Sequence, residues 1–334
     1  MRIGIVTQPL KANYGGVIQN WALQQVLKKM GHEPITIDYQ YSENFCYWCK
    51  INFYRFVKSL YKPSIRFEYL HKNVKRPKIF DSFIKKHIDT TKIVHKYSET
   101  IISKYQLDCI IIGSDQVWRP KYNHECLFDM FGQFIKQNDF KIISYAASFG
   151  TDDWEYSDEQ TIQCAKLIKR FGGISVREPG GVKFCKEKLK QSATQVLDPT
   201  LLLSKEEYNN LASGTPPLID KPFLAAYILD PTEEIVNNVT EKASRMGLKP
   251  FIFNADKDAS LTPIQWLTIF RDANYIITDS FHGSVFSIIY EKKFEPIENK
   301  FRGSARFNLI NQLKENQNIN ELREQSLNWL LNKL

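Results

Sequence analysis

The chain has 334 residues and a formal net charge of +8, and 43% of its residues are hydrophobic. These values are ordinary for a soluble globular protein and exclude a disordered chain, a collagen and a disulfide-rich miniprotein. The length exceeds what one hydrophobic core usually spans, so we expect two domains. No stretch approaches the roughly 18 uncharged apolar residues of a membrane span. The first residues are typical of a strand rather than a signal peptide, and six cysteines suit a reducing compartment, so we expect a cytoplasmic protein.

The N-terminal half predicts a β-loop-α-β unit, which opens a parallel α/β sheet. The helix of this unit is expected from about Val17 to Met30, because its apolar residues fall at helical spacing and Gly31 follows two lysines at its end. The strands of this half are expected at Arg2–Thr7, Pro34–Tyr39, Leu107–Ile112 and Lys141–Ala146.

Between the second and third of these strands we expect a helical insert at about residues 45–105. Its segment 45–92 carries twelve Lys and Arg against three acidic residues, among eleven aromatic side chains. This mixture suits an anionic lipid surface, with rings at the level of the headgroups. An ordinary insert whose aromatic side chains pack inward explains it as well. Nucleic acid would also attract such a segment, but we favour both other interpretations over it and expect no nucleic-acid partner.

The C-terminal half repeats the α/β pattern. Two helices are expected to begin at Asp230 and Thr262, each a capping residue followed by proline, and a third at about 283–290. We expect an N-terminal domain at 1–170, a C-terminal domain at 171–307 and a helical segment at 308–334. The predicted strands are Gly173–Val176, Gln195–Leu197, Phe223–Leu229, Pro250–Phe253 and Asn274–Thr278.

The loop after the first strand contains Asn13-Tyr14-Gly15-Gly16 and leads into a helix. Paired glycines let backbone amides approach an anion, and the helix dipole favours negative charge there. The loop lacks the Gly-x-Gly-x-x-Gly fingerprint of dinucleotide binding, so Asp38 near the usual ribose-binding position is a weak signal. The glycines could equally serve only to allow a tight turn.

Two more polar residues follow strands, at the edge of a parallel sheet where ligands bind. Asp115 follows the strand 107–112 and suits a general base or a contact to a sugar hydroxyl, with a helix cap as the alternative. Arg177 follows the strand 173–176. It faces a ligand or pairs with Glu178 or Asp198.

The strongest local signal is His282, within Thr278-Asp279-Ser280-Phe281-His282-Gly283-Ser284. This histidine follows a strand and stands at a helix start, and imidazole is the side chain best suited to move a proton near neutral pH. Downstream, Arg302 and Arg306 are four residues apart and suit a clamp on a phosphate or carboxylate, with an ordinary basic surface as the alternative.

Other motifs point away from several classes of enzyme. Cys46 and Cys49 form the only close cysteine pair and have no second pair nearby, so we expect no metal site. The sequence lacks Gly-x-Ser-x-Gly, a Gly-Lys-Ser/Thr phosphate loop and His-Glu-x-x-His. These absences argue against a serine hydrolase, a nucleotide-hydrolysing motor and a zinc protease.

Five segments occur in order along residues 3–310: Asn13–Asn20, Ile111–Trp118, Ser175–Glu178, Leu197–Leu202 and Asp279–Gly283. Together they resemble the polysaccharide pyruvyl transferase family. The resemblance implies a GT-B-like fold of two Rossmann-like domains with a central cleft, the acceptor on the N-terminal side and phosphoenolpyruvate on the C-terminal side. It implies transfer of a pyruvyl group from phosphoenolpyruvate to two hydroxyls of a sugar as a cyclic ketal, in surface or capsular polysaccharide synthesis, with no cofactor.

The resemblance also suggests roles for the polar residues. His282 would be a general acid or a contact to the leaving phosphate, Asp115 would accept a proton from the sugar, and Arg177 would be a cation of the catalytic site. Some family members carry arginine where this chain has Ser280, so Arg302 or Arg306 takes that place or the donor differs. The predicted substrate-binding residues are Asn13, Gly15, Gly16, Asn20, Ser280, Phe281, Gly283, Ser284, Arg302 and Arg306.

The expected acceptor is a galactose-type residue, which a polyprenyl-phosphate carrier could hold at the inner face of the plasma membrane, where residues 45–92 would contact anionic lipid. Two rival functions stay open at this point. One is a nucleotide-sugar glycosyltransferase with the same two-domain fold. The other is a non-catalytic family member that binds glycans.

Overall fold

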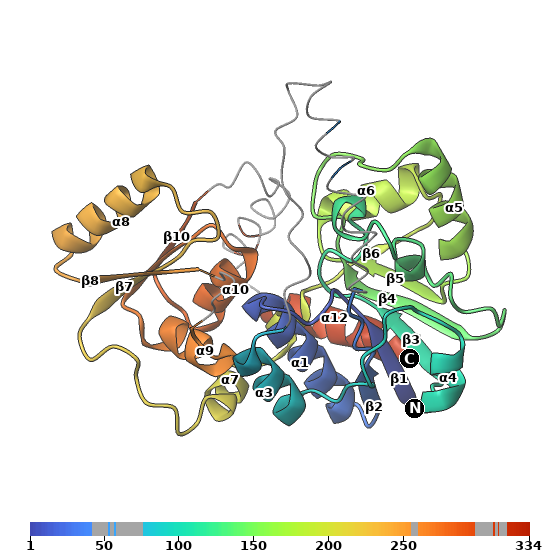
Figure 1. Ribbon diagram of the computed structural model, residues 1–334, viewed down its shortest axis with the longest axis horizontal. Helices are drawn as coiled ribbons and strands as arrows, with labels where there is room; N and C mark the ends of the chain where they lie inside the picture. The colour runs from blue at the N-terminus through green and yellow to red at the C-terminus, as the bar shows by residue number, and fades with distance from the viewer. Residues whose placement is uncertain are drawn as a thin grey trace.

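The computed structural model describes residues 1–41, 53, 57, 76–254, 260–297, 310, 313 and 319–334. Within these ranges the chain forms two α/β domains, and the strands of each sheet pair in parallel. Figure 1 shows the domains side by side, the first on the right and the second on the left. The predicted α/β class with two Rossmann-like domains is therefore confirmed.

Six strands form the first sheet, in the order β2-β1-β3-β4-β5-β6. All four residues of β3 are buried, as expected of a parallel strand covered by helices on both faces. The strands are β1 (Arg2–Val6), β2 (Glu33–Thr36), β3 (Cys109–Ile112), β4 (Lys141–Ala147), β5 (Gly173–Val176) and β6 (Thr194–Gln195).

Helices of the first domain begin where the sequence supplies a cap. The first helix, α1 (Tyr14–Lys29), starts before the predicted Val17, because the side chain of Asn13 accepts a hydrogen bond from the Gly16 amide at 3.1 Å. A capping box of Ser157 and Gln160 begins α5. The other helical elements are α3 (Lys78–His87), α4 (Thr100–Tyr105), η1 (Pro120–Tyr122), η2 (Asp129–Phe131), α5 (Asp158–Ile168) and α6 (Pro179–Glu187).

Four strands form the second sheet, in the order β10-β9-β7-β8. The helix α8 begins later than predicted, since Thr232 and not Asp230 is its cap and accepts a hydrogen bond from the Ile235 amide at 3.3 Å. The cap predicted at Thr262 is present as a capping box. The elements are β7 (Phe223–Tyr227), α8 (Glu233–Arg245), β8 (Lys249–Phe253), α9 (Pro263–Asp272), β9 (Tyr275–Thr278), α10 (Phe281–Ile289) and β10 (Phe294–Pro296).

The two sheets divide later in the chain than the predicted residue 170. Both β5 and β6 belong to the first sheet, because β5 pairs with β4 and β6 pairs with β5. The connection to the second sheet then runs through η3 (Pro199–Leu202) and α7 (Lys205–Leu211).

The last helix, α12 (Ile319–Lys333), lies within the segment predicted to be helical and returns to the first domain (Figure 1). The Leu197 amide donates to Ser326 Oγ at 2.9 Å, and Arg323 Nε donates to the carbonyl of Leu201 at 2.7 Å. The chain end is therefore held against the residues that follow β6.

A continuous hydrophobic core joins the domains. Tyr14, at the start of α1, stacks on Trp266 of the second domain with ring centroids 5.7 Å apart, and its hydroxyl donates to the carbonyl of Leu261 at 2.9 Å. In addition, Tyr208 of α7 packs edge-on against Phe286 of α10, with ring centroids 5.0 Å apart. The contacts of Tyr14 hold the start of α1 against the second domain, so loops from both sheets meet there.

Most of the basic segment 45–92 lies outside the described residues, so its predicted contact with lipid is not tested. Where the described chain resumes, Arg76 pairs with buried Asp38 and donates from Nε to the carbonyl of Leu10 at 2.6 Å. Two of the aromatic side chains of this segment, Phe80 and Phe83, are buried in the core. This favours an inward-packed insert for the part of it that the structure describes.

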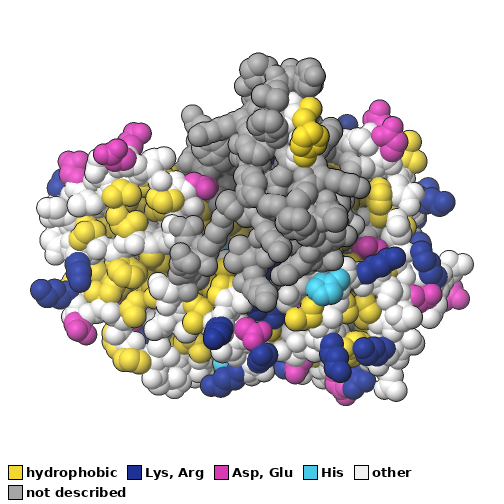
Figure 2. Space-filling view, viewed as in Figure 1, with side chains coloured by type: hydrophobic (Ala, Val, Ile, Leu, Met, Phe, Trp, Pro, Cys, Tyr) yellow, Lys and Arg dark blue, Asp and Glu magenta, His cyan; other side chains and the backbone are white. Residues whose placement is uncertain are grey.

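Lys and Arg side chains alternate with Asp and Glu ones over the described surface visible in Figure 2 and do not gather in one patch. Among the described residues, no helix combines the length and apolar character needed to cross a bilayer.

Candidate functional site

Two helix N-termini meet where the domains join. A Cβ atom added at Gly15, in the first turn of α1, would lie 2.2 Å from Nδ1 of His282, in the first turn of α10. An ordinary side chain does not fit at that distance, so glycine is the residue that lets the imidazole approach α1. Each helix brings amides without an intrahelical acceptor and the positive end of its dipole to this place. Anions are favoured at such a position.

The start of α10 is held by its own cap. The hydroxyl of Ser280 accepts a hydrogen bond from the Gly283 amide at 3.3 Å. A Cβ atom at Gly283 would lie 2.3 Å from Oγ1 of Thr278, so glycine there allows the helix to begin directly against the end of β9. Ser280, at the position where the family resemblance raises the expectation of arginine, therefore caps the helix that carries His282.

Arg177, directly after β5, lies at the centre of a buried ion cluster. Its side chain is 1% exposed, and Nη1 lies 3.1 Å from Oδ2 of Asp198 and 3.7 Å from Oδ1 of Asp115. Nε donates to Oε1 of Glu178 at 3.0 Å, and the guanidinium lies 4.2 Å from the ring centroid of Phe281. Of the roles that the sequence left open for Arg177, pairing with Glu178 and Asp198 is the one observed.

Burial and charge compete in this cluster. Burial alone would lower the pKa of Arg177, but the three surrounding carboxylates raise it overall. Burial would raise the pKa of Asp198, yet its interactions with His282 and Arg177 and a hydrogen bond from Thr200 lower it well below the ordinary range. Asp198 is therefore a carboxylate at neutral pH, and the cluster holds more negative than positive charge.

His282 reaches this cluster from the second domain. Its side chain is 10% exposed, and Nε2 lies 3.7 Å from Oδ2 of Asp198. That distance suits an ion pair when the imidazole is protonated but exceeds a hydrogen bond. Nε2 is buried without a hydrogen-bond partner among the described residues. A buried ring nitrogen in this state, beside a carboxylate, is well placed to take part in proton transfer.

Three hydroxyls complete the cluster and were not among the predicted site residues. Ser114 Oγ donates to Asp198 Oδ2 at 3.2 Å, and Thr200 Oγ1 donates to Asp198 Oδ1 at 2.7 Å. Ser148 Oγ donates to Oε1 of Glu178 at 2.6 Å. Asp198 itself was named only as a partner of Arg177. It follows β6 closely, so the criterion that selected Asp115, an acid after a strand, could have selected it too.

The remaining predicted residues divide into three groups. Asn13 and Gly16 form the cap of α1, and Ser284 is buried in the first turn of α10. Asn20 lies deeper in α1 and accepts a hydrogen bond from Thr36 Oγ1 at 2.8 Å, so it contacts β2 and not the ion cluster. Arg302 and Arg306 lie outside the described residues, as do Cys46 and Cys49, which were not predicted to form a site.

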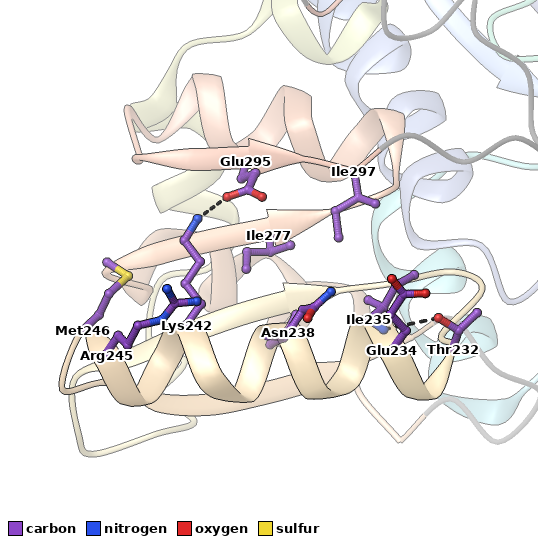
Figure 3. A pocket seen from close by; sticks show the side chains of 11 residues that line it. Thr232, Glu234, Ile235, Asn238, Lys242, Arg245, Met246, Ile277, Glu295 and Ile297 are labelled. Atoms are coloured by element: carbon purple, nitrogen blue, oxygen red, sulfur yellow. Dashed lines mark hydrogen bonds and ion pairs between the residues drawn. The ribbon is translucent and has the colours of Figure 1, made fainter.

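A separate groove of about 900 Å³ lies in the second domain, between α8 and the strands β9 and β10 (Figure 3). It is lined in part by Lys242, which pairs with Glu295 across it. None of the predicted site residues lines it. The junction of α1 and α10 is therefore the candidate site.

Comparison with solved structures gives distant matches. The chain is similar to UDP-GlcNAc 2-epimerase from Methanocaldococcus jannaschii, solved with UDP-GlcNAc and UDP, with a TM-score of 0.50 and 10% identity over 88% of this chain and 83% of that one. It is also similar to the epimerase from Rickettsia bellii, with a TM-score of 0.45 and 10% identity over 99% and 96% of the two chains. At such identity the first likeness shows the fold alone, which is the GT-B-like arrangement that we expected.

No curated protein matches the chain. The family profile described as polysaccharide pyruvyl transferase matches residues 13–300. This range includes both sheets from α1 onward and every predicted site residue except Arg302 and Arg306. The chain therefore belongs to the polysaccharide pyruvyl transferase family.

Proposed function

We propose that this protein transfers the pyruvyl group of phosphoenolpyruvate to two hydroxyls of one sugar, forming a cyclic ketal at the junction of α1 and α10. The observation that carries the proposal is the contact between Gly15 and His282, which joins two helix N-termini to a buried imidazole. A family of pyruvyl transferases needs a site for an anionic donor and a proton source beside it. This junction offers both.

The donor carries a phosphate and a carboxylate, so its site needs several positive groups. The two helix N-termini and a protonated His282 supply part of that charge. Arg177 does not, because three carboxylates already neutralise it. The further cations would therefore come from Lys300, Arg302 and Arg306, which belong to the stretch that follows β10.

The chemistry begins with a proton from His282 to C3 of the donor, which turns the methylene into a methyl group and leaves positive charge on C2. A sugar hydroxyl oxygen then bonds to C2, and its proton passes to Asp115. The C2–O bond to phosphate breaks, the second hydroxyl bonds to C2, and its proton goes to the departing phosphate. The proton on Asp115 returns to His282 through solvent, so one ketal and one inorganic phosphate form.

Asp115 suits the role of proton acceptor at the edge of the site. It lies directly beyond β3 and has a φ of +72°, a left-handed conformation that non-glycine residues seldom adopt. Its amide donates to Ser114 Oγ at 2.6 Å. The conformation is held by the same hydroxyl that contacts Asp198, so the carboxylate of Asp115 is fixed relative to the cluster.

The acceptor side of the proposal is a galactose-type sugar on the N-terminal domain, carried by a polyprenyl phosphate. Residues 45–92 would bring the enzyme to that carrier by contact with anionic lipid. Flotation with vesicles of phosphatidylglycerol and phosphatidylcholine tests this part. Protein that floats only with the anionic vesicles supports it, and protein that never floats contradicts it.

The test of the reaction incubates the protein with phosphoenolpyruvate and a panel of nitrophenyl galactosides. We expect release of inorganic phosphate together with a product whose mass has increased by one pyruvate ketal. Replacing His282 with glutamine should slow phosphate release by roughly 10²–10⁴-fold, the usual range for a general acid. The variant His87→Gln, which changes a histidine on α3, is the matched control and should keep the wild-type rate. Binding of a UDP-sugar, with no phosphate released from phosphoenolpyruvate in the presence of any galactoside, would instead favour a nucleotide-sugar glycosyltransferase.

A further inference from the structure

Asp198 is a fully buried carboxylate that the proposed reaction does not use. Its side chain is 0% exposed, and both oxygens are engaged. Oδ1 accepts hydrogen bonds from the amide and the hydroxyl of Thr200, at 3.0 Å and 2.7 Å. Oδ2 accepts from Ser114 Oγ at 3.2 Å and from Arg177 Nη1 at 3.1 Å. Four donors from three segments of the first domain therefore fix the position of this carboxylate.

The same Oδ2 faces the second domain. Nε2 of His282 lies 3.7 Å from it and has no hydrogen-bond partner among the described residues. Catalytic hydrogen bonds are often long before the substrate binds and shorten in the complex. Nδ1, the other ring nitrogen, lies on the side of Gly15. The ring is thus placed between a buried carboxylate and the N-terminus of α1.

The charged groups near Nε2 of His282 are mostly negative. Asp198 faces this nitrogen from the position just before η3, and behind Asp198 lie Asp115, Arg177 and Glu178, which follow β3 and β5. Three carboxylates against one guanidinium leave an excess of negative charge, which favours a hydrogen atom on Nε2 over a lone pair there. Consistent with this, interaction with His282 is one cause of the lowered pKa of Asp198, against burial, which acts to raise it.

We propose that Asp198 is a positioning residue for His282, accepting a hydrogen bond from Nε2 so that the ring presents Nδ1 to the ligand beside Gly15. This inference rests on the proposed function for its catalytic meaning. In that reaction Nδ1 gives its proton to C3 of phosphoenolpyruvate, and Nε2 keeps its proton toward Asp198. Arg177 acts indirectly, because its contact with Asp198 holds that carboxylate in place.

The first test needs only wild-type protein and no substrate. Histidine labelled with nitrogen-15 is incorporated, and the ring signals of His282 are assigned by their absence in His282→Gln. Above the titration of this ring we expect the tautomer that carries hydrogen on Nε2. The tautomer with hydrogen on Nδ1 would overturn the inference, whatever reaction the protein catalyses.

The second test compares Asp198→Asn with Glu178→Gln. Both remove one buried carboxylate next to Arg177, but only Asp198 faces His282. In Asp198→Asn we expect the nitrogen-15 spectrum to show loss of the tautomer with hydrogen on Nε2, because the ring loses the acceptor that orients it. Phosphate release should slow at least about tenfold. In Glu178→Gln both the tautomer and the rate should change much less.

Equal changes in the two variants would show a general effect of charge and overturn a positioning role for Asp198. If phosphate release is never detected but the tautomer of His282 and its loss in Asp198→Asn are as expected, the proposed function fails while the Asp198–His282 pair stands.

Discussion

Gly15 and His282 touch across the junction of the two domains, with no room for a side chain between them. A Cβ atom at Gly15 would lie 2.2 Å from Nδ1, 2.4 Å from Cγ and 2.8 Å from Cβ of the histidine. The glycine that begins α1 therefore determines how close the imidazole at the start of α10 can come. The proposed reaction depends on this contact, because it places a proton donor at two helix N-termini.

Replacing Gly15 with alanine should displace His282. The added methyl group overlaps the ring, and overpacking of this kind costs about 1–3 kcal/mol. We expect a lower free energy of unfolding in urea and loss of phosphoenolpyruvate binding. The control is Gly172→Ala, where the nearest atom to the new Cβ is the Ile142 carbonyl oxygen at 3.8 Å. Wild-type binding by Gly15→Ala would show that the contact is not part of the donor site.

Removing the Arg177 side chain should mainly destabilise the fold. Its loss leaves Asp115, Glu178 and Asp198 without their buried counter-ion, and breaking a buried pair in this way costs about 3–5 kcal/mol. We expect Arg177→Ala to lower Tm by at least roughly 6 °C. Arg245→Ala, which removes a 70% exposed side chain from α8, should leave Tm nearly unchanged. A normal Tm with weakened donor binding would instead make Arg177 a direct donor ligand.

Asp198 should make stability depend on acid pH. Although burial opposes it, the pKa of Asp198 is lowered in the folded protein by His282 and Arg177. Its contribution is therefore complete above the pKa of an unfolded aspartate, about 3.9, and is lost as the pH falls through the lower folded value. The difference in unfolding free energy between wild type and Asp198→Asn should shrink from about pH 6 to about pH 3. A difference that stays constant over this range would contradict the shift.

Asp129 should make stability depend on pH in the opposite direction to Asp198. Burial raises the pKa of this carboxyl group to about 6, with Lys136 and Lys96 opposing the shift. The folded protein thus holds its proton to a higher pH than the unfolded chain, and stability falls as the pH rises from about 4 to about 6. We expect Asp129→Asn to raise Tm at about pH 7.5 and to change it little at about pH 4. Equal Tm changes at both pH values would contradict this account.

The sequence identified charged residues that follow strands, but it did not identify the side chains that these residues contact. Asp115, Arg177 and His282 each follow the end of a strand within about four residues, and strands of a parallel sheet bring such residues to one edge. That argument correctly grouped Asp115 and Arg177, and the structure adds His282 across the domain junction. It could not show that Arg177 is neutralised, because this depends on how three carboxylates from separate segments pack around it.

Three other expectations from the sequence differ from the structure, each for a local physical reason. β5 and β6 have four and two residues, too few for their pattern to show which sheet they join, so the domain boundary was expected too early. Asn20 is on the same helix as Gly15, but helix geometry turns it toward Thr36 in the core. Asp38, a weak signal for ribose binding, instead pairs with Arg76, which lies 38 residues further along the chain.

The most direct measurement is calorimetric titration of phosphoenolpyruvate into wild-type protein and into His282→Gln, with and without a nitrophenyl galactoside. The control is His87→Gln. We expect saturable binding to wild type and to the control, and binding weakened at least about tenfold in His282→Gln. Absence of phosphoenolpyruvate binding to wild type under both conditions, with saturable binding of a UDP-sugar, would contradict this expectation.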